Sequence, residues 1–288
     1  MMILKRNLIT SIKAIMYKTL LVSLSAFSLL IPKPGQASDE LIMGSVAMDT
    51  PAVMYKRLKP LTEYLSSKLD KKIILKLSAN MKEAITEVAS NNVHLSYLTP
   101  VAYLKAHKKG NSRLVAKTVT KGKSSFQLMI IVKNDSPYKN INDLIGKSFA
   151  FGDPAALLQR AVVVGSGLKL KDFSTVRYLG HYDNIARGVY SGDFDAGILK
   201  DTLAFKWQQK GLRVLYASPQ LPPYNIVVNG KFDDALYKKI VDAFLKLDSK
   251  NPEHLKIIKA LDKKYTGFAA TNDKEYDVVR KLIAPFNK

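Results

Sequence analysis

Two periodicities of apolar residues alternate along this chain, one typical of buried strands and one typical of amphipathic helices. Short apolar runs are followed by segments with apolar residues three and four positions apart. In the first half we expect strands at 41–47, 72–77, 93–98, 114–120 and 126–133. We expect helices there at 54–69, 81–89 and 101–107. This alternation predicts an α/β fold with mostly parallel sheets and helices on both faces.

The alternation stops at the Asn134-Asp135-Ser136-Pro137 turn and then begins again. Strands are expected at 148–151, 175–179, 195–199, 213–216 and 225–228, and helices at 154–166, 183–190 and 202–209. Helical periodicity continues at 233–247, 252–261 and 273–283. Extended strands near 126–133 and 225–229 would link two α/β lobes around a cleft. We expect lobe 1 to be discontinuous, with residues 38–128 and 226–288, and lobe 2 to span 129–225.

A basic and then apolar leader precedes the first expected strand. Its basic residues are Lys5, Arg6, Lys13, Lys18 and Lys33. The apolar run, Thr19 to Ile31, is shorter than the ~20 residues that a spanning helix needs, and small residues follow it before a cleavage site near Ser38. We therefore expect residues 1–37 to be a secretory signal peptide rather than an uncleaved anchor, with the mature protein in the periplasm.

Charge and cysteine content narrow the function further. The chain has no cysteine, so we expect neither a lipobox lipid anchor nor thiolate metal or redox chemistry. The net charge of +21 falls to +16 without the five basic leader residues, which favours anionic partners. Because the lysines are spread along the chain rather than clustered with aromatic residues, we expect no nucleic-acid binding.

One segment predicts an anion site directly. The strand expected at Ser148–Phe151 ends in Gly152-Asp153-Pro154. We expect Asp153 to cap the following helix and Pro154 to be its first residue. The backbone N–H groups and the positive end of that helix would then face a ligand in front of them.

The chain resembles the periplasmic solute-binding proteins of phosphate, phosphite and phosphonate ABC transporters, the phosphonate-binding (PhnD-like) group. The segments that carry the resemblance are Pro60–Leu65, Leu98–Tyr103, Val132–Pro137, Asp143–Pro154, Gly180–His181, Gly192–Ala196 and Ser218–Pro219. The resemblance implies a type II periplasmic-binding fold, with two lobes joined by two crossing strands and a ligand cleft between them. It also implies an ABC permease as the membrane partner.

The ligand segment departs from the family pattern. In the family, Gly-Asp-Pro is followed by Asn and by a Ser-Thr-Ser-Gly run that holds the phosphonate oxygens, whereas Ala155-Ala156-Leu157-Leu158-Gln159 follows here. Each lost charge-assisted hydrogen bond would cost roughly 1.5–3 kcal/mol. Phe126 stands where the family often has Tyr, and Thr202 stands where some members have an acid for the ligand's amine. We expect a small anionic ligand with an apolar portion rather than a simple phosphonate.

Ligand contacts are expected from both lobes. The candidate residues are Met48, Asp49, Tyr97, Tyr103, Phe126, Ala155, Ala156, Leu157, His181 and Asp195. Of these, His181 matches the family's site histidine, and Ala155 and Ala156 would contribute backbone N–H groups. Core packing is an alternative for Tyr97 and Tyr103, a structural role is favoured for Asp195, and a solvated position is favoured for Arg160.

Catalytic patterns are weak. No serine lies in a Gly-x-Ser-x-Gly elbow, the four histidines lack metal-ligand spacing, and no phosphate-binding P-loop is present. We therefore expect a binding protein that is not an enzyme and has no cofactor, and the family resemblance implies that it is a monomer. Two alternatives remain open: a periplasmic partner of a membrane sensor kinase, and a non-binding scaffold of the same fold.

Overall fold

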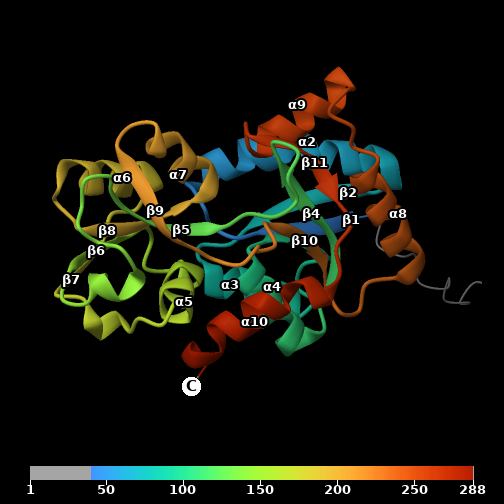
Figure 1. Cartoon of the computed structure of the whole chain (residues 1–288). Helices are drawn as coiled ribbons and strands as arrows, with labels where there is room; N and C mark the ends of the chain where they lie inside the picture. The colour runs from blue at the N-terminus through green and yellow to red at the C-terminus, as the bar shows by residue number, and fades with distance from the viewer. Residues whose placement is uncertain (1–39, 288) are drawn as a thin grey trace, which may run out of the picture. The chain divides into compact units, whose positions relative to one another are not determined.

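The computed structural model describes residues 40–287, and this part of the chain forms two α/β lobes, each built on its own sheet (Figure 1). The expected signal peptide lies outside the described residues. Among residues 40–287, no helix is both long enough and apolar enough to cross a membrane. The residues at which we divide the two lobes stay a prediction.

The first lobe contains a six-stranded sheet with the order β11-β4-β10-β3-β1-β2. Its strands are β1 (Glu40–Ser45), β2 (Lys72–Leu77), β3 (Leu95–Leu98), β4 (Arg113–Thr120), β10 (Asn225–Val228) and β11 (Tyr265–Ala269). β1 pairs in parallel with β2 and β3, whereas β10 is antiparallel to β3 and β4, and β11 is antiparallel to β4. The sheet is therefore mixed rather than mostly parallel, because the chain re-enters this lobe through β10 in the opposite direction.

Helices cover both faces of this sheet, as Figure 1 shows. One face carries α2 (Pro51–Leu69), α8 (Asp234–Leu245) and α9 (Pro252–Leu261). The other carries α3 (Met81–Ala89), α4 (Pro100–Gly110) and α10 (Asp277–Ile283). The apolar periodicity of each helix explains this arrangement, since the buried residues of α3, for example, are Ala84, Ile85, Val88 and Ala89.

The second lobe contains a five-stranded sheet with the order β7-β6-β8-β5-β9. Its strands are β5 (Leu128–Lys133), β6 (Ser148–Phe151), β7 (Thr175–Tyr178), β8 (Ala196–Lys200) and β9 (Leu212–Ala217). Its helices are α5 (Leu157–Gly165), α6 (Tyr182–Ser191) and α7 (Asp201–Gln208). β6 is parallel to β7 and β8, whereas β5 is antiparallel to β8 and β9. This sheet is mixed because β5, the strand by which the chain enters the lobe, runs opposite to both of its neighbours.

Two segments cross between the lobes, from β4 to β5 and from β9 to β10. Their backbones form one isolated bridge, where the N–H of Phe126 donates to the Leu221 carbonyl at 3.0 Å and the N–H of Leu221 donates to the Phe126 carbonyl at 2.8 Å. Side chains add further bonds between them, such as the one from the Ser125 hydroxyl to the Gln220 side-chain oxygen at 2.8 Å. β4 pairs with β10 on one side of this bridge, and β5 pairs with β9 on the other. The crossing is therefore a two-stranded connection with a backbone bridge at its centre.

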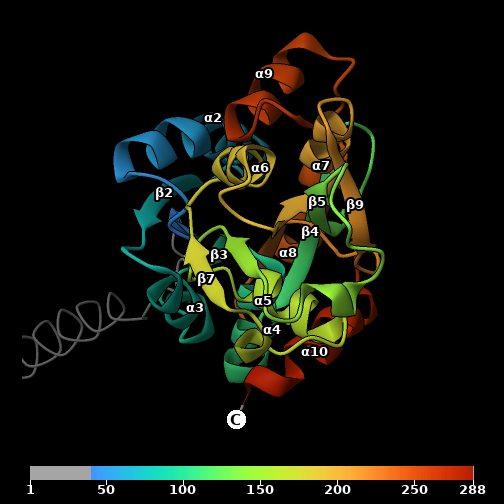
Figure 2. The same ribbon diagram turned by 60° about the vertical axis from the view of Figure 1, so that its left-hand side comes forward.

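The α3, α4 and α10 side of the molecule shares one apolar core with the second lobe. Val279 of α10, Leu98 of β3, Phe149 of β6 and Val162 of α5 belong to the same buried cluster. α10 packs on both α4 and α5, and Figure 2 shows these three helices next to one another. The C-terminal helix thus contacts both lobes.

Two expectations about local structure are wrong. The helix expected from Pro154 begins three residues later, at Leu157, and β11 was not expected at all. β11 contains Gly267 with φ of 150° and a register shift between Tyr265 and Gly267. A glycine inside a short strand weakens the strand pattern, which is why the sequence indicated no strand there.

Candidate functional site

A cleft of about 490 Å³ lies between the two lobes. From the first lobe it is lined by Ala47, Met48, Ala79, Asn80, Met81, Ile85, Thr99, Pro100, Val101, Ala102 and Lys105. From the crossing segments and the second lobe it is lined by Phe126, Leu128, Asp153, Ala155, Ala156, Leu157, Leu158, Gln159, Tyr182, Lys200 and Tyr224. Most of these residues follow the carboxyl end of a strand, which is where open α/β sheets bind ligands.

Five helices begin at this cleft. Their first residues or N-caps are Asn80 and Met81 (α3), Thr99 and Pro100 (α4), Ala156 and Leu157 (α5), Tyr182 (α6) and Lys200 (α7). Each helix N-terminus carries a partial positive charge of about half an elementary charge. The backbone of both lobes therefore makes the cleft favourable for an anion before any side chain is considered.

The caps of α3 and α4 fix the first-lobe wall. The side-chain oxygen Oδ1 of Asn80 accepts the N–H of Glu83 at 3.0 Å, and the Thr99 hydroxyl accepts the N–H of Ala102 at 3.1 Å. Pro100 occupies the first helical position, where its missing N–H costs nothing. These caps are the local reason why both helices start at the cleft edge.

The turn at Asp153 differs from our prediction. Its carboxylate accepts the N–H of Ala155 at 2.7 Å, and its carbonyl accepts the N–H of Ala156 at 2.9 Å. A proline after an aspartate fits this tight turn as well as it fits a helix start. The N–H groups of Ala155 and Ala156, which we expected to face the ligand, therefore bind Asp153 instead.

An apolar wall replaces the hydroxyl groups of the family pattern. Leu157 and Leu158 open α5 and are partly buried, and Met48 and Met81 belong to the cleft lining from the first lobe. Ala156, the N-cap of α5, makes no side-chain cap hydrogen bond. The cleft therefore combines a positive backbone field with methyl and thioether groups.

Lys200 is the cation at the inner side of the cleft. It ends β8, and its ammonium nitrogen lies 4.7 Å from the centroid of the Phe126 ring. Burial lowers the pKa of Lys200 below its usual 10.5, an effect that nearby Asp201 and Asp262 oppose. Within residues 40–287, no ion pair includes Lys200. An anionic group in the cleft would thus meet a partly desolvated cation that, among the described residues, is near Asp201 and Asp262 but paired with neither.

Two tyrosines add hydroxyl groups. Tyr224 stacks on Tyr97 with ring centroids 5.3 Å apart, and burial raises the pKa of its hydroxyl. Burial also raises the pKa of Tyr182, against a hydrogen bond from Gln159 that lowers it. The side-chain oxygen of Gln159 in turn accepts a hydrogen bond from the N–H of Gly152 at 2.8 Å. Both tyrosines are protonated at neutral pH, so they can donate hydrogen bonds to an anion.

Five of the ten predicted contact residues line the cleft together. They are Met48, Phe126, Ala155, Ala156 and Leu157. Phe126 also forms the backbone bridge with Leu221 that joins the two crossing segments. The structure therefore brings together the residues that the strand ends and the Gly-Asp-Pro segment indicated.

The other five lie elsewhere in the structure. Tyr97 is buried in the core, with its hydroxyl 2.6 Å from that of Tyr265. Tyr103 is buried and donates to Asp273 at 2.5 Å. Asp49 is exposed and pairs with Arg57 at 3.1 Å. His181 is exposed at the N-cap of α6, beside Tyr182.

Asp195 has the structural role that we favoured for it. Its carboxylate accepts hydrogen bonds from the Tyr138 hydroxyl at 2.6 Å, the Ser148 N–H at 2.8 Å and the Ser148 hydroxyl at 2.7 Å. These bonds join β6 to the segment before β8, inside the second lobe. Asp195 is absent from the residues that line the cleft.

Sequence reasoning missed Lys200, Tyr182 and Tyr224. Lys200 is the last residue of β8, and Tyr182 opens α6 shortly after β7. The rule that ligands bind at the carboxyl ends of strands could therefore have indicated both residues. Tyr224 lies in a crossing segment, and no local pattern marks it. Among residues 40–287, no group of His, Cys, Asp and Glu could hold a metal ion.

Comparison with known proteins gives a consistent result. The sequence model of the family described as "ABC transporter, phosphonate, periplasmic substrate-binding protein" matches residues 43–276. The chain is 24% identical over 277 residues to the phosphonates-binding periplasmic protein of Escherichia coli (strain K12), covering 90% of this chain and 80% of that protein.

Two solved structures have the same fold. PhnD1 from Prochlorococcus marinus (MIT 9301), in complex with methylphosphonate, matches with a TM-score of 0.68 and 21% identity over 87% of this chain and 99% of that chain. XAC2383 from Xanthomonas citri, bound to ATP, matches with a TM-score of 0.72 and 17% identity over 86% of this chain and 96% of that chain. Both likenesses concern the two-lobe architecture.

Proposed function

The chain belongs to the family of phosphonate periplasmic substrate-binding proteins of ABC transporters, and we propose that it closes its two lobes on a small organic anion with an apolar portion. The closed form would deliver this ligand to an ABC permease in the inner membrane. The observation that carries the proposal is Lys200, a partly buried cation without an ion pair among residues 40–287, in a cleft where five helices begin.

The anionic part of the ligand is supported by the charges of the cleft. Lys200 and the helix N-termini are positive, and the Tyr182 and Tyr224 hydroxyl groups can donate. The one carboxylate in the lining, Asp153, is occupied by the N–H of Ala155. A phosphonate, sulfonate or carboxylate bound beside Lys200 would accept hydrogen bonds from Lys200 and from those donors that it reaches.

The apolar part is supported by the start of α5. The side chains of Leu157 and Leu158 offer no hydrogen bond to a phosphonate oxygen. Methylphosphonate would therefore place polar oxygens against an apolar wall, and its single methyl group would cover little of that wall. A ligand with an alkyl or aryl group would bury that group against Leu157, Leu158 and Met48. Each buried CH₂ group contributes about 0.8 kcal/mol.

Closure would occur at the crossing segments. They meet through the Phe126–Leu221 pair, so small changes in the backbone on either side of it can rotate one lobe relative to the other. A ligand that contacts both lobes would shift the equilibrium toward the closed form. We propose that His181, at the exposed start of α6, reaches the ligand only after this closure.

The test is a thermal-shift and calorimetric panel on the mature protein purified from the periplasm of its host. The panel contains phosphate, methylphosphonate, longer alkyl- and arylphosphonates, sulfonates and ATP. We expect the alkyl or aryl compounds to raise the melting temperature more than phosphate and methylphosphonate do. If methylphosphonate bound most tightly, the proposed preference for a ligand with an apolar portion would be wrong. If no anion changed the melting temperature, the non-binding scaffold would be favoured.

A second measurement tests the location. We propose that residues 1–37 are removed near Ser38 and that the protein is then periplasmic. Amino-terminal sequencing of the protein recovered by osmotic shock should give a first residue at or near Ser38. Recovery of the intact chain in the membrane fraction would contradict this.

A further inference from the structure

A second, larger hollow adjoins the cleft. It has a volume of about 1140 Å³ and lies between α3, α4 and α10, and it shares Met81, Ile85, Lys105 and Ala155 with the cleft. Because four residues line both spaces, the two lie side by side, with the shared residues at their common border.

The hollow is strongly basic. Six of its lining side chains are basic or can become so, namely Lys82, Lys105, His107, Lys108, Lys109 and Arg280, and we call it the basic groove. None of its lining residues in the described part of the chain is Asp or Glu. Its floor is apolar, with Ile85, Leu104 and Ile283.

The four lysines are not used by the fold. Within residues 40–287, no ion pair includes Lys82, Lys105, Lys108 or Lys109. Lys105 is followed by Lys108 and Lys109 at i+3 and i+4 on α4, a spacing at which like charges repel each other. Lys82 lies in the first turn of α3, where the helix dipole disfavours a cation. The arrangement costs stability in the absence of an anion.

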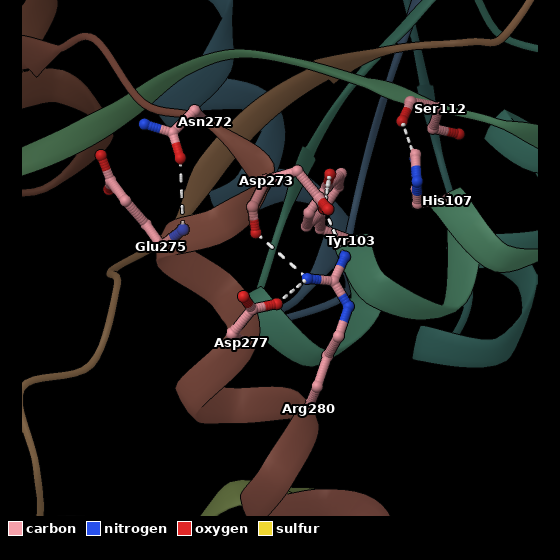
Figure 3. Close-up of polar contacts among 8 residues, drawn as sticks. All are labelled: Tyr103, His107, Ser112, Asn272, Asp273, Glu275, Asp277 and Arg280. Carbon is pink, nitrogen blue, oxygen red and sulfur yellow. Dashed lines mark hydrogen bonds and ion pairs between the residues drawn. The ribbon is translucent and has the colours of Figure 1, made fainter.

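Arg280 forms the opposite wall and is fixed in place, as Figure 3 shows. Its guanidinium donates to the Asp277 carboxylate at 2.6 Å and also to the Asp273 carboxylate. Tyr103 donates to the same Asp273 at 2.5 Å, which ties α4 to the turn before α10. The pairing satisfies the charge of Arg280, so the lysines supply the unpaired charge of the groove.

His107 is also oriented by the fold. Its Nδ1 lies 2.8 Å from the Ser112 carbonyl oxygen, so Nδ1 carries the proton and donates to that oxygen (Figure 3). The Tyr103 and His107 rings are 5.6 Å apart. The groove therefore has two basic side chains held by hydrogen bonds, His107 and Arg280, and four lysines outside any ion pair of the described residues.

We propose that the basic groove is a second anion subsite of the same receptor, which binds the far anionic group of an elongated ligand whose first anionic group lies beside Lys200. This inference rests on the proposed function. The ligand class is an organic molecule with anionic groups at both ends and an apolar middle, which would cross the apolar residues Met81 and Ile85 shared by the two spaces.

The test compares ligands that differ only at the far end. Alkylphosphonates of three to six carbons are matched with α,ω-bisphosphonates of the same lengths, and affinities are measured by calorimetry on the mature protein. We expect at least one bisphosphonate to bind about tenfold or more tightly than its alkyl partner. This preference should shrink as salt is raised, since exposed lysines are screened.

The variant K108Q/K109Q isolates the groove, because these residues are exposed and do not line the cleft. It should lose most of the bisphosphonate preference and keep the alkylphosphonate affinity. The matched control K238Q/K239Q removes two adjacent exposed lysines of α8, which line neither space, and should change neither affinity.

The outcomes separate the two ideas. Equal affinities for both ligand types at every chain length, or an unchanged preference in K108Q/K109Q, would show that the basic groove is not an anion subsite. Either result would leave the proposed function standing. No binding of either type would overturn the proposed function, and the groove with it.

Discussion

The ammonium group of Lys200 lies 4.7 Å from the centroid of the Phe126 ring, across the base of the cleft. Lys200 ends a strand of the second lobe, and Phe126 belongs to a crossing segment that is bonded to its partner at Leu221. The cation that we propose for ligand binding therefore contacts a crossing segment. If the lobes close by bending these segments, the ligand charge and the lobe movement would act on the same pair of side chains.

The variant Lys200→Met should bind organic anions at least about tenfold more weakly, because it removes a charge-assisted hydrogen bond. Its melting temperature without ligand should not fall, since a desolvated cation is replaced by an apolar group of similar length. Calorimetry and thermal melting measure the two effects. Lys206→Met, an exposed position on α7, is the control; a similar loss of affinity there would contradict a specific role for Lys200.

Ligand affinity should also depend on pH through Lys200. Burial lowers the pKa of Lys200, so the folded protein releases this proton below 10.5, where the unfolded chain still holds it. Across that interval the ligand affinity should fall as pH rises, while the contribution of Lys200 to the free energy of unfolding increases. Titrations at rising pH on the wild type and on Lys200→Met measure this, and the same pH dependence in both would refute it.

Restoring the family's hydroxyl groups should change ligand preference. The variant A156S/L157T/L158S is expected to bind methylphosphonate at least about tenfold more tightly, because each charge-assisted hydrogen bond contributes roughly 1.5–3 kcal/mol. The variant L157A/L158A removes the apolar wall without adding donors and should not gain this affinity. Ala156→Ser alone should raise stability by about 1 kcal/mol, since the N-cap of α5 is otherwise unfilled.

Asp195→Asn should destabilise the second lobe by about 2 kcal/mol and leave ligand affinity unchanged. The hydrogen bonds from Tyr138 and Ser148 to the carboxylate account for this cost. Burial by itself would raise the pKa of Asp195, but these bonds outweigh it and hold the pKa below 3.8. The advantage of the wild type should therefore be present above pH 3.8 and be lost as pH falls through the folded-state pKa.

Chemical denaturation at several pH values measures the effect of Asp195→Asn. The exposed neighbour Asp193 provides the control Asp193→Asn, which should have nearly wild-type stability. A loss of ligand affinity in Asp195→Asn, with stability intact, would instead assign this residue to the site.

Val279→Ala should lower the free energy of unfolding of the whole molecule by about 1–3 kcal/mol. Val279 is fully buried in the core that α10 shares with α5 and with the sheets of both lobes. Trp207, the one tryptophan of the chain, lies in α7 of the second lobe and reports on that lobe by fluorescence. The fluorescence and circular dichroism midpoints should shift together, and a fluorescence midpoint left in place would show that the lobes unfold separately.

Most of the fold could be predicted because apolar periodicity is a local property. The strand expected at Ser148–Phe151 and the helix expected at 81–89 agree with β6 and α3. The directions of β5 and β10 could not be predicted, because they depend on pairing between segments far apart in the chain, such as β5 with β8 and β10 with β3. The start of α5 was misplaced because Asp153 can satisfy neighbouring N–H groups in a turn or in a helix.

The site was only partly predictable for a similar reason. Met48 and Leu157 follow strands or open a helix, and the structure places them at the cleft. Tyr97 also lies close to the end of a strand, but its side chain is buried in the core, where its hydroxyl meets that of Tyr265. The sequence does not tell to which side such a residue points, since the choice is made by packing with residues far away in the chain.

The contact of α10 with α5 has a consequence for biosynthesis. The strands and helices of the second lobe precede Tyr224, yet Ala161 and Val162 of α5 share their core with Val279 and Ile283 of α10, which follow much later in the sequence. A nascent chain would thus expose an apolar face of α5 until α10 has been made. The α5 wall of the cleft would therefore be fully packed only after α10 has joined it.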